Sequence, residues 1–179
     1  VNALYENASL NISEKDSVLD IENNYEAIQN GLTVTLDMSH LSEEEQKKAF
    51  VGTVFGLKLD YNSSFRKGNK VSSKVKAFGK YKVGFDNVAP RIYNPNFIEG
   101  SNISKLSTLS VSISDALSGI DTYNAYLNGE WILMEYDYKT KKLVHNLKDG
   151  KVISGKNDIK IVVTDKLDNT ATFSSNFIY

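Results

Sequence analysis

Residues 126–133 read Tyr126-Leu127-Asn128-Gly129-Glu130-Trp131-Ile132-Leu133, and they carry the most informative structural signal in the chain. An Asn-Gly pair lies here between two runs of aliphatic and aromatic residues. Both central residues of the tightest hairpin turn need positive φ, which Asn and Gly adopt readily, so the pair is a strong hairpin signal. The stretch predicts a β-hairpin in which Tyr126 faces Trp131, with Leu127 opposite Glu130 and Ala125 opposite Ile132.

The rest of the chain alternates apolar and polar residues with a period of two, most clearly over 32–38, 109–113 and 159–163. Such alternation places one apolar face inward and one polar face outward, as in antiparallel sheets. A longer strand is expected over 50–60. The fold class predicted from these patterns is all-β, with tandem antiparallel β-sandwich domains of immunoglobulin-like topology.

One short segment favours a helix instead. Ser42, followed three positions later by Glu45, forms a capping box, with acids in the first turn and lysines in the last. We expect a short helix near 42–49 that crosses over between two strands of the first domain.

The length of 179 residues suits two sandwiches, since such domains take about 100 residues each. Pro90 removes a ladder donor and holds Ala89 extended just before a new strand pattern begins. The predicted domains are therefore residues 1–86, a β-sandwich with the short helix, and residues 87–179, an immunoglobulin-like domain.

Composition excludes several classes of function. The net charge is −1, from 21 basic and 22 acidic residues spread along the chain, which argues against nucleic acid as a partner. No apolar run approaches the roughly 18 residues needed to span a bilayer, so membrane insertion is not expected. Cysteine is absent, which removes disulfides and thiolate chemistry.

Motifs in the second half carry a resemblance. They are Asp86 to Pro90, Asp115 with Ser118-Gly119-Ile120, and Val163-Thr164-Asp165 with Asn169. In this set the chain resembles bacterial immunoglobulin-like modules. It departs from them at Asp168, where these modules more often carry Gly. If the backbone there is left-handed, Asp is modestly strained.

A more specific resemblance lies in residues 128–137 and 139–141, supported in the first half by 37–39 and 57–61. These segments look like the non-catalytic C-terminal region of bacterial envelope proteins whose N-terminal part is a lysostaphin-like zinc metallopeptidase. The resemblance implies an accessory or interaction region located in the cell envelope, periplasmic or extracellular. Its implied partners are an upstream catalytic domain of the same polypeptide and cell-wall glycan or an envelope protein.

The zinc-binding pattern of such peptidases, His-x-x-x-Asp with His-x-His, does not occur in this chain. Glu44 stands four positions after His40, and Asn146 and Leu147 follow His145. A catalytic zinc site usually takes three protein ligands. We therefore predict no catalytic residue, no metal site and no cofactor here, and a structural or surface role for both histidines.

The remaining candidates are acidic and aromatic. Asp115, Asp121 and Asp165 would form a calcium cluster if they met at one end of the sandwich, but Asp at strand ends more often caps turns. Side-chain alternation places Trp131, Tyr126 and Asn124 on the hairpin face opposite the predicted core. That face is either an exposed ligand-binding platform or is covered by another part of the chain. The leading functional hypothesis is a non-catalytic accessory region, and the alternative is an independent glycan- or protein-binding module that uses this platform.

Overall fold

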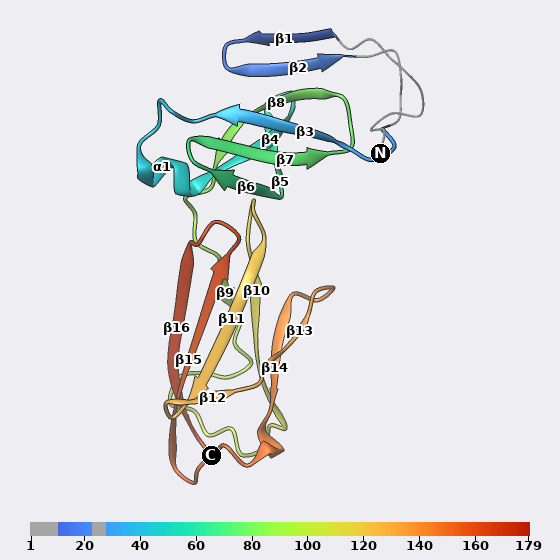
Figure 1. The fold of residues 1–179 in the computed structure, drawn as a ribbon. Coiled ribbons are helices and arrows are strands. Elements are labelled where there is room, and N and C mark those ends of the chain that lie inside the picture. Colours follow the sequence, from blue (N-terminus) through green and yellow to red (C-terminus); the bar gives the residue numbers. More distant parts are fainter. Residues whose placement is uncertain (1–10, 23–27) are drawn as a thin grey trace. The chain divides into compact units, whose positions relative to one another are not determined.

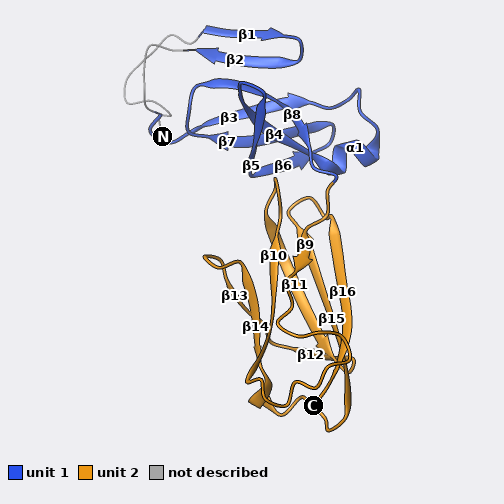
Figure 2. Cartoon of the chain, turned by 180° about the vertical axis from the view of Figure 1, so that it is seen from behind, with its two compact units in different colours: residues 1–87 blue, residues 88–179 orange. Residues whose placement is uncertain are grey.

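The computed structural model describes residues 11–22 and 28–179 and divides into two compact units, Val1–Asn87 and Val88–Tyr179 (Figures 1 and 2). Residues 1–10 and 23–27, which belong to the predicted first domain, lie outside the described residues. The sequence patterns place the boundary between residues 86 and 87. Both units are built from antiparallel strands arranged in two sheets, so the all-β sandwich prediction is confirmed.

The first unit contains a five-stranded and a three-stranded sheet. The five-stranded sheet has the order β1 (Asn11–Lys15), β2 (Val18–Glu22), β8 (Gly79–Phe85), β4 (Ala49–Phe55), β5 (Lys58–Asn62). The other has the order β3 (Leu32–Asp37), β7 (Lys70–Val75), β6 (Ser64–Lys67). Val34, Val51 and Val71 are fully or almost fully buried within one apolar cluster that draws on both sheets.

Helix α1 (Glu43–Lys48) connects β3 of one sheet to β4 of the other, as the crossover prediction requires. The Ser42 hydroxyl accepts a hydrogen bond from the backbone N–H of Glu45, and the Glu45 carboxylate accepts one from the backbone N–H of Ser42. These two bonds satisfy donors that a helix N-terminus leaves without partners. The predicted capping box is therefore confirmed.

The strand predicted over 50–60 is wrong, because the chain turns at Gly56 and forms the hairpin of β4 and β5. Gly56 has a φ of 57°, which a glycine adopts without steric cost. Two other glycines in this sheet mark a close approach: a Cβ at Gly52 or Gly84 would lie 2.5 Å from side-chain atoms of Leu59. The Leu59 side chain thus occupies space that only glycine leaves open.

The second unit consists of two four-stranded sheets. One has the order β13 (Glu135–Asp137), β14 (Lys142–Asn146), β10 (Thr108–Ser114), β9 (Arg91–Tyr93). The other has the order β12 (Glu130–Ile132), β11 (Ile120–Leu127), β15 (Lys156–Asp165), β16 (Thr170–Ile178). The strands from β9 to β16 can be lettered A, B, C, C′, D, E, F and G in chain order. The two sheets then have the strand orders D-E-B-A and C′-C-F-G of an immunoglobulin-like sandwich. A short 3-10 helix, Leu147–Asp149, follows β14.

Strand β15 shows how the alternating pattern forms the core of this unit. Ile159, Ile161 and Val163 are buried, whereas the intervening Lys160 is exposed and Val162 is only partly buried. The inward residues join one apolar cluster contributed by both sheets. The opposite side of the β12-β11-β15-β16 sheet, called here the outer face, carries the candidate site.

Candidate functional site

The hairpin of β11 and β12 has the predicted register. Tyr126 pairs with Trp131, Ala125 with Ile132 and Leu127 with Glu130. At the turn, Asn128 has a φ of 53° and Gly129 a φ of 87°, so both turn residues are left-handed as a type I′ turn demands. The local prediction is confirmed, and it fixes which side chains share a face.

The two faces of the hairpin differ sharply in burial. Ala125 and Ile132 are each 2% exposed and lie in the core, whereas the Trp131 side chain is 54% exposed. Tyr126 is partly buried and Asn124 is exposed. Of the two hypotheses for Trp131, the structure therefore supports exposure. The Trp131 Nε1–H donates a hydrogen bond of 3.3 Å to Asn124 Oδ1, which orients the indole ring.

Tyr126 and Trp131 belong to a continuous row of side chains across the sheet. Tyr126 pairs with Lys160 of β15, and Lys160 pairs with Ser174 of β16. Directly paired residues point to the same side of a sheet. We call this row the aromatic row, after its first two members. It consists of Trp131, Tyr126, Lys160 and Ser174, one residue from each of the strands β12, β11, β15 and β16 (Figure 1).

A groove of about 570 Å³ lies over the end of this row, and we call it the outer groove. Tyr126, Lys160 and Ser174 line it, and the next polar positions, Asp158 and Asn176, extend the lining. The Asn176 Nδ2 donates a hydrogen bond of 3.0 Å to the Glu99 carboxylate, which also lines the groove. Sequence reasoning missed these residues of β15, β16 and the loop before β10, because no local pattern places them beside the hairpin.

Trp131 and Asn124 line a second, neighbouring hollow of about 410 Å³ together with Leu133, which is 60% exposed. The paired aromatics Tyr126 and Trp131 therefore each contribute to one of two hollows on the same sheet. The outer groove has the volume of a ligand site, and its lining combines one aromatic side chain, Tyr126, with mainly polar groups.

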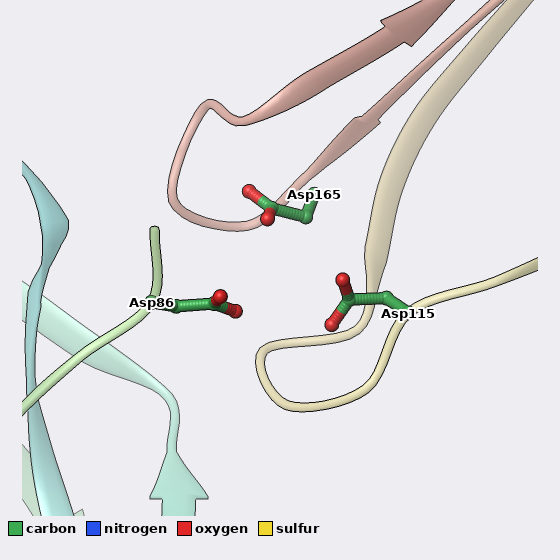
Figure 3. A group of neighbouring side chains, drawn as sticks. All are labelled: Asp86, Asp115 and Asp165. Carbon is green, nitrogen blue, oxygen red and sulfur yellow. The ribbon is translucent and has the colours of Figure 1, made fainter. Parts of the chain in front are cut away.

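Asp115 and Asp165 stabilise the loops that follow β10 and β15 (Figure 3). The Asp115 carboxylate accepts hydrogen bonds from the backbone N–H groups of Leu117 and Gly119, at 2.9 and 2.8 Å. Asp165, fully buried, accepts bonds from the Asn169 backbone N–H at 2.9 Å and from its side-chain amide at 2.8 Å. These contacts match the turn-forming interpretation of both aspartates.

Within the second unit, carboxylate oxygens of Asp115 and Asp165 lie within 4.8 Å of each other. Asp121, which the sequence analysis grouped with them, is exposed on β11 and is not part of this pair, so that grouping is wrong. The third residue drawn in Figure 3, Asp86, belongs to the first unit, where its backbone N–H donates to the Lys48 carbonyl.

The two histidines have different environments. His40 is exposed in the first unit. His145 is 2% exposed on β14, and its Nδ1 lies 2.9 Å from the carbonyl oxygen of Leu133. His145 pairs with Leu109 of β10, which is also buried. The imidazole therefore lies on the core side of the sheet. Within residues 11–22 and 28–179, neither histidine belongs to a group of three potential metal ligands.

None of the helices in the described part of the chain is long and apolar enough to cross a membrane.

No protein-family model and no curated protein matches the chain. A solved chain of Clostridium thermocellum CbhA fibronectin(III)-like modules is similar over 83% of this chain and 86% of that chain, with 12% sequence identity and a TM-score of 0.37. The fold assignment rests on the strand orders given above.

Proposed function

We propose that this chain is a non-catalytic accessory region of a larger cell-envelope protein, one directed at peptidoglycan. Its role is to bind at the cell wall and hold an upstream catalytic domain of the same polypeptide near its substrate. This places it in the periplasm or outside the cell. The resemblance of residues 128–137 and 139–141 to the C-terminal regions of envelope metallopeptidases supports the proposal, and so does the all-β tandem architecture.

The observation that carries the proposal is the exposure of Trp131. A side chain of this size that is 54% exposed on a sheet face, beside a half-buried Tyr126, leaves a large apolar surface in water. Exposed aromatic surface rimmed by polar residues is typical of binding sites. The outer face is therefore the surface by which we expect the region to attach.

Sedimentation with purified peptidoglycan tests the proposal. The chain should pellet with the insoluble cell wall, and Trp131→Ala should pellet much less. Tyr138→Ala is the matched control, because Tyr138 is an aromatic residue of the same unit, 72% exposed, that lies between β13 and β14 on the other sheet. A wild-type chain that stays in the supernatant would contradict attachment to the wall.

An independent protein-binding module is the second candidate, favoured by the exposed Leu133 beside Trp131. If an envelope protein is the partner, crude cell walls should retain the chain, and walls stripped of protein by protease should not. Retention on protease-treated walls favours the glycan-containing polymer itself.

The proposed parent protein has its own test. The reading frame upstream of Val1 should encode a domain with His-x-x-x-Asp and His-x-His motifs. A different upstream domain would refute the link to a zinc metallopeptidase while leaving the binding experiments unaffected.

A further inference from the structure

We infer that the outer face binds a carbohydrate chain that lies across the four strands, with Trp131 and Tyr126 against the apolar faces of sugar rings and the outer groove holding the adjoining hydroxyls. The inference rests on the proposed function and names the chemical class of its ligand. It follows from the shape, the hydrogen-bonding groups and the charge of this face.

The aromatic part of the outer face is preorganised for stacking against a sugar ring. Trp131 lies on the edge strand β12 directly opposite Tyr126, and the side chains of such pairs begin about 5 Å apart. The hydrogen bond from the indole N–H to Asn124 limits rotation of the exposed ring. A ring held in position before binding loses little conformational entropy when a ligand stacks on it. Pyranose rings present C–H faces that suit such a surface.

The polar part continues the same row. Lys160 and Ser174 follow Tyr126 across β15 and β16, about 5 Å apart from strand to strand. Beside them, Asp158 and Asn176 line the groove with Glu99. Carboxylates accept, ammonium groups donate, and amides and hydroxyls do both. This mixture suits hydroxyl groups, each of which donates and accepts.

Charge distinguishes carbohydrate from the other polymers that stack on aromatics. The groove contains one cation, Lys160, against the carboxylates of Asp158 and Glu99, and Asp158 also forms an ion pair of 3.3 Å with Lys156. Nucleic-acid sites need a positive surface to neutralise phosphates. A near-balanced set of charges fits an uncharged, hydroxyl-rich chain instead.

Trp131 is the only tryptophan in the chain, so its fluorescence reports on this site alone. Titration with chitohexaose, a soluble β-1,4-linked N-acetylglucosamine oligomer, should shift the emission to shorter wavelength and saturate. Cellohexaose, which lacks the acetamido groups, tests the sugar preference, and saturation by either sugar supports the inference. Free stem peptides of peptidoglycan should leave the emission unchanged.

Calorimetry with the same oligomers tests the residues. Trp131→Ala should weaken binding by about tenfold or more, the loss expected for one aromatic contact. Lys160→Ala and Asn176→Ala should also weaken it while leaving the Trp131 fluorescence as a probe. Lys142→Ala, on β14 of the other sheet, is the matched control and should bind as the wild type does.

Two outcomes overturn the inference and remain distinguishable from failure of the proposed function. If the chain pellets with peptidoglycan but neither sugar oligomer binds, attachment is real and its ligand is not the glycan. If stem peptides shift the Trp131 emission and sugars do not, the outer face is a peptide site. A chain that binds neither the intact wall nor the oligomers fails both tests.

Discussion

Asp165 and Asn169 are joined by three hydrogen bonds that close the turn between β15 and β16, one of them from the Asp165 backbone N–H to the Asn169 carbonyl at 3.0 Å. The Asp165 carboxylate accepts from the backbone N–H of Asn169 with one oxygen and from its side-chain amide with the other. The first oxygen also accepts from the Leu167 backbone N–H at 2.8 Å. One buried carboxylate therefore organises the link between the two longest strands of the second unit.

Replacing Asp165 by Ala should destabilise the second unit by about 3 kcal/mol, because several donors in the turn lose a charged acceptor. Urea unfolding measures the change. Asp121→Ala, an exposed aspartate on β11, should change the unfolding free energy by no more than about 0.5 kcal/mol. Equal effects of the two substitutions would mean that Asp165 has no special structural role.

Asp168 in the same turn has a φ of 60°. This is the left-handed conformation in which the sequence analysis expects an Asp at this position to be strained. Glycine adopts this conformation without the clash that a Cβ causes. Asp168→Gly should raise the unfolding free energy by about 0.5 kcal/mol, after allowance for the greater freedom of glycine in the unfolded chain. Lys166→Gly in the same turn, where φ is not positive, should lower it.

Trp131 and its neighbour Ile132 allow a direct comparison of the two sides of one strand. Trp131→Ala should cost no more than about 1 kcal/mol, since the side chain already lies half in water. Ile132→Ala should cost about 2–5 kcal/mol, because Ile132 is 2% exposed in the core. Thermal or urea unfolding measures both. If Trp131→Ala lowered the unfolding free energy as much as Ile132→Ala does, the indole would be a packing residue. The binding proposals would then lose their basis.

The predictions from sequence that succeeded concern features encoded within a few residues. The Asn128-Gly129 turn fixes its own register through backbone preference, and Ser42 with Glu45 fixes the start of α1. Alternation in 159–163 gives the inward face of β15 directly. Each of these signals is local, so neither the rest of the chain nor a partner strand is needed to interpret it.

The features that sequence reasoning missed depend on contacts between distant residues. Residues that favour strands flank the turn at Gly56 on both sides. The sequence pattern of 50–60 therefore looks like one continuous strand and does not reveal the turn. Lys160 and Ser174 join the aromatic row only through the pairing of β11 with β15 and of β15 with β16. Asp121 and Asp115 look alike in the sequence, as aspartates near strand ends. Asp121 lies within β11, however, whereas Asp115 lies in the loop after β10.

Tyr81 predicts an alkaline limit to the stability of the first unit. Its side chain is 1% exposed, its hydroxyl donates a 2.6 Å hydrogen bond to the Ala77 carbonyl, and burial raises its pKa above the ordinary value of 10.0. The folded chain therefore keeps this proton where the unfolded chain releases it. Stability present below pH 10 should fall as the pH rises above that value.

Urea unfolding of the full chain between pH 8 and pH 11 measures this effect. Tyr81→Phe should cost about 1 kcal/mol at pH 8, for the lost hydrogen bond, and should show a smaller decline towards pH 11. Tyr138→Phe, which alters an exposed tyrosine, should decline as the wild type does. An unchanged decline in Tyr81→Phe would assign the alkaline loss to other groups.

The second unit should fold without the first, because its core is complete within its own sequence. Among the residues that the structure describes, the apolar cluster that joins its two sheets draws only on residues from Phe97 to Phe177, with Ile92 and Tyr179 packed at its margins. A fragment of residues 86–179 has a length at which sandwich domains fold alone, since such a chain buries well over half of the surface that it exposes when unfolded. Calorimetry should show one cooperative transition whose calorimetric and van't Hoff enthalpies agree. Ile161→Ala, which removes a fully buried side chain from the centre of β15, should lower the transition temperature of the fragment, and the exposed Lys160→Ala should not. A fragment that aggregates or unfolds without cooperativity would mean that the two halves depend on each other to fold.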